Sequence, residues 1–257
     1  MQTEDNAIEM AIRQIKKGVL TKDGKLAGTG FIRLHDIGVL AVPALKAELS
    51  RINLRKVDRR GHAGLLAGLA TILHDISEED SLAFIDGALS GRHHPVNGAT
   101  LRIIRRHRQS HFRKVKINDI NVWESMAIDP RYQATKHIQR WLQNVPENDL
   151  SGISRIYIIE EKPEQDFLGY YFPSTAFITL VWRSSAHPNI PIHWLLRFLH
   201  EGTFYHEVGH HRHGHEPLGQ DPAQEEEANR YSVQKMREAH LWLRMIRTIL
   251  RRIVGRR

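Results

Sequence analysis

The stretch His206-Glu207-Val208-Gly209-His210 determines what the second half of the chain is expected to form. On an α-helix the two histidines are one turn apart and leave the same face, and imidazoles at that spacing can bind one zinc ion at about 2.0–2.1 Å each. Glu207 then leans towards the coordination position where water binds, which places its carboxylate to act as a general base. The stretch therefore predicts most of a catalytic zinc site on one helix.

An acidic cluster, Glu225-Glu226-Glu227-Ala228-Asn229, begins 15 residues after His210. The intervening chain contains glycines at 214 and 219 and prolines at 217 and 222, which must interrupt the helix. A second helix that begins near Pro222 can carry the cluster back to the two histidines. Two histidines and one glutamate would leave the fourth position of a tetrahedral zinc ion open for water.

The run from Phe204 to Met236 resembles the gluzincin metallopeptidases, in particular the small ImmA/IrrE-type peptidases. Those proteins pair a His-Glu-x-x-His helix with a downstream helix that reads Glu-x-Glu-Ala-Asn/Asp. In that pattern the metal-binding glutamate sits four residues before the Asn or Asp. The close resemblance covers this run and leaves the first half of the chain outside it.

The resemblance implies one zinc ion (Zn2+) per chain, held by His206, His210 and Glu225. It also implies that Asn229 is a supporting residue, which holds a liganding histidine by accepting its other ring N–H. The two glutamates that follow Glu225 stay open as alternative third ligands.

Two runs rich in β-branched residues predict strands before the motif, Ile153 to Ile159 and Thr175 to Trp182. The second strand is expected to lie beside the motif helix. The short run of Gly169, Tyr170 and Tyr171 is a candidate edge along which an extended peptide substrate can pair by strand addition. A helix-compatible run at residues 193–199 leads directly into the motif.

Residues 1–118 are expected to form an α-helical domain. Apolar residues recur at helical spacing in the ranges 37–49, 61–76, 82–89 and 96–108. Similar pentapeptides at 45–49 and 85–89 lie 40 residues apart, a period within the range of HEAT or armadillo repeats, and residues 41–45 resemble a HEAT first helix. Two such units do not make an array, so a HEAT-like bundle and an irregular helical domain both stay open.

The predicted fold class is therefore α+β. The helical domain is followed by a zincin-like domain over residues 119–257, with a small β-sheet, the His-Glu-x-x-His helix, the glutamate-bearing helix and a basic C-terminal helix. Apolar residues of that last helix recur at helical spacing between 236 and 253 and are expected to pack on their own domain.

The composition restricts the metal chemistry. Among its 257 residues the chain has no cysteine, which excludes disulfides and thiolate ligands, so a metal must be held by histidine, carboxylate or backbone oxygen. No apolar run approaches the roughly 18 residues of a membrane span, and the first residues lack the basic and apolar regions of a signal peptide. We expect a soluble, cytoplasmic protein without a transmembrane segment.

The net charge is +8, and most of the excess lies in the ranges 51–60, 102–116 and 244–257. Such clusters can bind nucleic acid or an acidic protein, but solvated helix faces carry them as well. No zinc finger, RNA-recognition signature or helix-turn-helix pattern accompanies them. The charge therefore allows nucleic acid as a partner, but no sequence motif supports it.

Several other polar residues near the motif allow two interpretations. Three tyrosines of the chain could stabilise an oxyanion or pack in the core, namely Tyr170, Tyr171 and Tyr231. The histidines that follow the motif are expected at the surface or as supporting groups, namely His211, His213 and His215. His200 and Glu201 are expected to pack or to be exposed, and His93 and His94 lie in a loop without a partner at ligand spacing.

These patterns lead to one hypothesis and two alternatives. The hypothesis is a zinc-dependent endopeptidase that hydrolyses a polypeptide substrate, with Glu207 as general base for metal-activated water. The resemblance implies a regulatory or repressor-like substrate, and a repeat-like helical domain would offer a surface to a protein partner. The alternatives are a catalytically silent zinc-binding module and a nucleic-acid-associated regulator.

Overall fold

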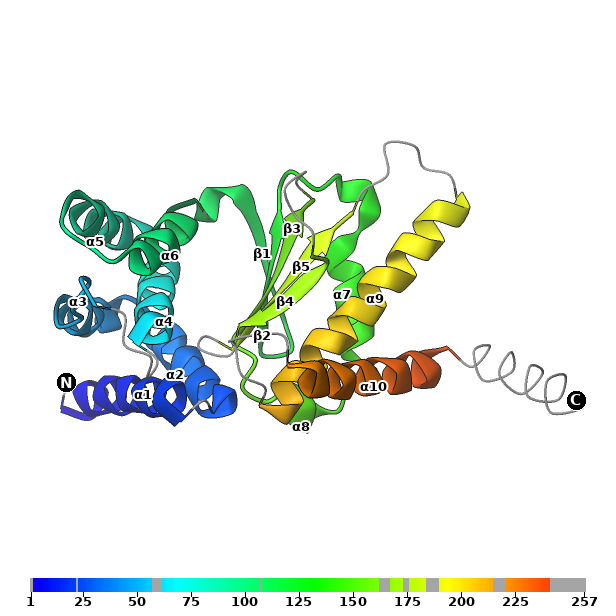
Figure 1. The fold of residues 1–257 in the computed structure, drawn as a ribbon, viewed down its shortest axis with the longest axis horizontal. Helices are drawn as coiled ribbons and strands as arrows, with labels where there is room; N and C mark the ends of the chain where they lie inside the picture. The colour runs from blue at the N-terminus through cyan, green and yellow to red at the C-terminus, as the bar shows by residue number, and fades with distance from the viewer. Residues whose placement is uncertain are drawn as a thin grey trace, which may run out of the picture.

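The computed structural model describes residues 2–21, 23–56, 62–106, 108–161, 167–172, 176–183, 190–214 and 221–240. The fold is α+β, with a helical part followed by a five-stranded sheet and its helices (Figure 1). Each part has a large hydrophobic cluster of its own. The described helices include none that is long and apolar enough to cross a membrane.

The helical part is built around its fourth helix. Its helices are α1 (Gln2–Thr21), α2 (Gly24–Ile37), α3 (Val42–Ser50), α4 (His62–Ile76), α5 (Glu78–Ser90) and α6 (Pro95–Arg106). Helix α4 is apolar around most of its circumference and contacts the other five, because a helix of that composition must be buried on all sides. The four ranges predicted as helical all overlap helices, with a 3-10 turn at Gly38–Ala41 inside the first.

The second part is a mixed sheet with helices against it. Its elements are β1 (Phe112–Ile117), β2 (Ile120–Ser125), α7 (Ala134–Leu142), α8 (Glu147–Leu150), β3 (Arg155–Glu160), β4 (Gly169–Phe172), β5 (Phe177–Trp182), α9 (Ile190–His213) and α10 (Pro222–Ala239). The strand order is β1-β2-β3-β5-β4, with β2, β3 and β5 parallel and the two outer strands antiparallel to their neighbours. Strand β4 therefore forms one edge of the sheet.

Residues of β3 alternate between the two faces of the sheet, as the pleat requires. Ile156 and Ile158 are fully buried in the cluster that includes the apolar side of α9. Arg155 and Tyr157 point to the other face, where Tyr157 packs with Trp123 and Phe112. The strands predicted at 153–159 and 175–182 are thus confirmed as β3 and β5.

Strand β1 was not expected, because residues 1–118 carry almost no strand signal. Its middle residues are exposed and two of them are lysines, Lys114 and Lys116. Charged side chains are common on edge strands, and they hide the alternation of apolar and polar residues by which a strand is recognised in a sequence. Strand β1 pairs with β2 in the same sheet, and the division of the chain at residue 118 stays a prediction.

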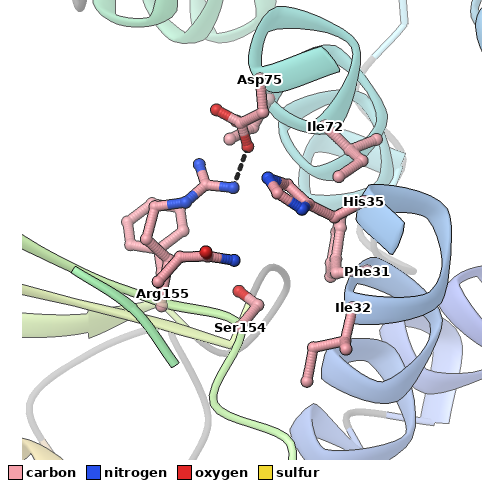
Figure 2. A pocket seen from close by; sticks show the side chains of 10 residues that line it. Phe31, Ile32, His35, Ile72, Asp75, Ser154 and Arg155 are labelled. Atoms are coloured by element: carbon pink, nitrogen blue, oxygen red, sulfur yellow. Dashed lines mark ion pairs between the residues drawn. The ribbon is translucent and has the colours of Figure 1, made fainter. Parts of the chain in front are cut away.

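A buried ion pair joins the two parts (Figure 2). Asp75 of α4 contacts the guanidinium of Arg155 on β3, and both side chains are almost completely buried. Arg155 also donates a 2.6 Å hydrogen bond to the Tyr157 hydroxyl and lies over the Trp123 ring. Figure 2 shows His35 of α2 beside the pair. A buried pair of this kind contributes little net stability, but loss of one partner leaves an uncompensated charge.

Replacing Asp75 by leucine is expected to lower the free energy of unfolding by about 3–5 kcal/mol, because Arg155 would stay buried without a counter-charge. The double variant Asp75→Leu/Arg155→Met removes both charges and should lie much closer to the unmodified protein. Urea unfolding followed by circular dichroism measures both. If the single variant were as stable as the double one, Arg155 would not depend on Asp75 for compensation.

Candidate metal centre

Helix α9 carries the motif with one face in the core and one face outward. Phe204, Tyr205 and Val208 are fully buried and anchor the helix to the sheet. His206 and His210 lie on the other face, where 19% and 13% of their side chains are exposed. The core therefore fixes the rotation of α9 and directs both imidazoles to the same side.

Helix α10 begins where the sequence predicts, at Pro222. Asp221 precedes it and accepts a 2.9 Å hydrogen bond from the Ala223 amide, and proline in the first turn needs no amide partner. This start places Glu225 in the first turn of α10, beside the motif. Ala228 and Tyr231 are buried against α9.

Gly209 allows the two helices to cross closely. A methyl group at this position would lie 3.0 Å from Ala228 Cα and 3.2 Å from the Ala228 carbonyl oxygen. Both are backbone atoms of α10, so any larger residue must push the whole helix away. Glycine costs about 1 kcal/mol relative to alanine inside a helix, and the crossing gives a physical reason for it here.

Three side chains meet at this crossing in a metal-binding arrangement. His206, His210 and Glu225 each offer one ligand atom, and these atoms lie within 4.8 Å of one another. The Nε2 atoms of the two histidines are 2.9 Å apart, and the Glu225 carboxylate oxygens lie 3.3 Å from His206 Nε2 and 3.5 Å from His210 Nε2. Tetrahedral ligands at zinc distances are separated by about 3.3 Å. The three residues therefore fit a zinc ion.

Asn229 lies one turn after Glu225 and orients the first histidine. Its Oδ1 atom is 3.0 Å from His206 Nδ1, and since a carbonyl oxygen can only accept, the Nδ1–H of His206 donates. The Nε2 lone pair of a neutral His206 then points to the cluster, as metal binding requires. Asn229 thus occupies the position that the resemblance implied.

The two neighbouring glutamates point elsewhere. Glu227 lies 3.7 Å from His213 Nδ1, and Glu226 is exposed on the outer side of α10. Of the three acidic residues in the cluster, Glu225 is the one that meets both histidines.

Glu207 is almost completely buried beneath β4, next to the cluster. The pKa of its carboxyl is raised to about 8, first by burial and then by the negative charge of Glu225, while a hydrogen bond from the Tyr171 amide opposes the shift. A divalent cation on the cluster would act in the same direction as that amide and favour the carboxylate. Gly169 leaves room for the Glu207 carboxylate, because a methyl group at position 169 would lie 3.2 Å from Glu207 Oε1.

The two tyrosines of β4 lie on opposite faces of the strand. The Tyr170 ring packs against Phe167 and Phe177, away from the cluster. The Tyr171 hydroxyl donates to Nδ1 of His211 at 2.9 Å, and Nε2 of His211 donates to the Ser151 carbonyl at 2.9 Å. Burial lowers the pKa of His211 to about 4, which keeps the ring neutral in this chain of bonds.

The remaining residues singled out from the sequence have ordinary packing roles or lie apart. Tyr231 donates to the Asp149 carboxylate, and His200 stacks on Trp182 and accepts from the Arg183 amide. Glu201 is buried and accepts from the Tyr205 hydroxyl. His215 lies outside the described residues, and His93 and His94 are in the loop before α6.

Many of the described cations in the basic ranges have acidic neighbours. The ion pairs are Arg51 with Glu48, Arg105 with Asp86, Arg108 with Glu78, Arg113 with Glu124 and Lys116 with Asp119. These pairs offset part of the positive charge that a nucleic acid could contact in these ranges. The third basic range, 244–257, lies outside the described residues.

The chain was also compared with protein-family models, curated proteins and solved structures, and none of them matches it. The geometry of the cluster on α9 and α10 is therefore the observation that bears on function. Sequence reasoning missed two contributors to it. The role of Gly209 requires knowledge of the helix crossing, and the bond from Tyr171 to Glu207 comes from a backbone amide, which no residue type reveals.

We expect about one zinc per purified chain, and loss of that zinc in His206→Ala and Glu225→Ala. Glu226→Ala and Glu227→Ala are matched controls that remove the same charge one or two residues away and should keep the metal. Mass spectrometry of metal content, with circular dichroism to verify folding, measures this. Zinc retained by a folded Glu225→Ala, or lost from Glu226→Ala, would contradict the ligand assignment.

Gly209→Ala is expected to weaken zinc binding on the order of tenfold, because displacement of α10 moves both Glu225 and Asn229. Gly202→Ala is the control on the same helix. The nearest atom to a methyl group there is Ser232 Oγ at 3.9 Å, an ordinary contact, so this variant should keep its zinc affinity. Competition with a chelating dye gives both affinities, and equal values would show that the crossing tolerates a methyl group.

Proposed function

We propose that this protein is a zinc-dependent endopeptidase of the gluzincin type. The observation that carries the proposal is the approach of His206, His210 and Glu225 at tetrahedral spacing beside the buried carboxylate of Glu207. Zinc bound by these three side chains would polarise a peptide carbonyl and lower the pKa of a water molecule. Residues of the chain would carry out the proton transfers and bind the substrate.

Glu207 is the general base in this proposal. It is adjacent to a ligand in the sequence, buried from bulk water and held by the Tyr171 amide. A carboxylate so placed takes the proton of the attacking water and passes it to the nitrogen of the leaving amine. Burial and the charge of Glu225 raise the pKa of this carboxyl, whereas zinc on the cluster would favour the carboxylate form that the first transfer needs.

The free edge of β4 is the proposed binding site for an extended polypeptide substrate. The Tyr171 amide binds Glu207 rather than β5, so the backbone groups of Tyr171 lie on the outer side of β4, and its carbonyl would be left to pair with a substrate strand. Leu195 and Leu199 precede His206 by eleven and seven residues and share its helical face. They are 52% and 40% exposed and can contact apolar substrate side chains.

The finer architecture is also part of the proposal. Helices α1–α6 would form a HEAT-like domain, and the sheet with α7–α10 a zincin-like domain. The packing of α1 on α2, α3 on α4 and α5 on α6 supports the first.

Val39 and Leu40, 69% and 57% exposed in the turn before α3, offer apolar contacts to a protein partner. The resemblance implies that the substrate is a regulatory or repressor-like protein.

Glu207→Gln should retain zinc and lose hydrolysis, because an amide cannot accept the proton of water. The measurement is cleavage of a peptide library by the zinc-loaded protein, read by mass spectrometry. Gln143→Ala, in the turn after α7, is an exposed control that should leave cleavage unchanged. Equal cleavage by the Glu207→Gln variant and the unmodified protein would reject the general base. Zinc retention without any cleavage by the unmodified protein would favour a silent zinc-binding module.

A further inference from the structure

A hollow lies on the far side of α9 from the metal cluster. It has a volume of about 270 Å³ and is lined by residues of α7, the first half of α9 and the end of α10. The α9 residues that line it are Trp194, Arg197, Phe198 and Glu201, which share one helical face. His206 comes nine residues after Arg197, which rotates it by about 180° around the helix. The hollow is therefore distinct from the cluster.

Aromatic rings form one wall of this hollow. Trp194 and Phe198 are stacked, with ring centroids 5.6 Å apart and planes at 23°. Trp141 lies in the lining and continues inward as a stack with Trp182, at 6.2 Å and 23°. Trp194 is 46% exposed although it is one of the largest apolar side chains in the protein. Such a wall favours a flat ligand that stacks on the exposed indole.

Two arginines supply positive charge at the same place. Arg140 of α7 and Arg197 of α9 line the hollow, are exposed and form no ion pair with any acidic residue that the structure describes. Both arginines are close enough to act on His137 of α7. The pKa of that histidine is lowered to about 4, first by burial and then by the charges of Arg197 and Arg140. Guanidinium groups bind carboxylate and phosphate groups well, and this hollow is lined by two of them.

The acidic residue of the lining, Glu201, forms no ion pair with either arginine. Glu201 Oε1 accepts a hydrogen bond from the Tyr205 hydroxyl at 3.1 Å, and Glu201 Oε2 accepts from His240 Nε2 at 2.9 Å. Both oxygens are thus engaged with neighbours in the wall. The side chain is buried, whereas the guanidinium groups are exposed.

We propose that this hollow binds a small aromatic anion, a planar ring that carries a phosphate or carboxylate group. The ring stacks on Trp194, and the anionic group binds Arg140 and Arg197. The volume suits one ring system with its anionic group, at the lower limit of small-molecule sites. The site is independent of the metal cluster and of its proposed chemistry.

Isothermal titration calorimetry of the full chain tests this with adenosine 5′-monophosphate and indole-3-acetate. At least one of them should bind once per chain, and the tighter of the two tells a nucleotide from an aromatic carboxylate. Adenosine has the ring without the anion and inorganic phosphate the anion without the ring, so each should bind at least tenfold more weakly than adenosine 5′-monophosphate if the nucleotide is the preferred ligand.

Variants locate the bound ligand. Arg140→Gln, Arg197→Gln and Trp194→Leu change exposed side chains and should each weaken binding at least tenfold. Arg92→Gln removes the same charge from an exposed position after α5 and should not change it. Failure of both probes to bind would overturn the proposal. So would binding that survives the three substitutions, or binding that is lost in His206→Ala, which would place the anion at the metal cluster.

Discussion

Gly209 of α9 and Ala228 of α10 meet where the two helices cross, with no side chain between their backbones. This contact sets the distance between the helix that carries His206 and His210 and the helix that carries Glu225 and Asn229. A larger residue at either position would separate His206 and His210 from Glu225. The break between the helices and the capped start of α10 at Asp221 determine which glutamate arrives at the crossing.

The rest of the fold holds this crossing in place and connects it to the helical part. Gly28 of α2 packs on the Gly152 carbonyl, where a methyl group would overlap it at 1.6 Å. The adjacent Ser151 carbonyl accepts from His211, His211 accepts from the Tyr171 hydroxyl, and the Tyr171 amide donates to Glu207. A continuous series of contacts therefore runs from the helical part through β4 to the buried glutamate. The ion pair of Asp75 and Arg155 joins the two parts at a second place.

Local patterns in the sequence predicted the elements that local forces determine. The strands β3 and β5 follow from runs of β-branched residues, and the break before Pro222 from proline and glycine. Which glutamate meets the two histidines depends on the rotation of α10 relative to α9, and the acidic run alone does not reveal that rotation. Strand β1 is hidden by exposed lysines. His211 resembles its neighbours in the sequence, yet it is buried because the chain folds Ser151 and Tyr171 against it.

Anomalous diffraction at the zinc absorption edge, from crystals of the protein purified with its own metal, tests the central claim most directly. The account predicts one peak per chain at about 2.0–2.2 Å from His206 Nε2, His210 Nε2 and a Glu225 oxygen, with a water molecule as the fourth ligand. A peak held instead by the histidines after the motif, or a zinc ion without Glu225 in its coordination sphere, would contradict it.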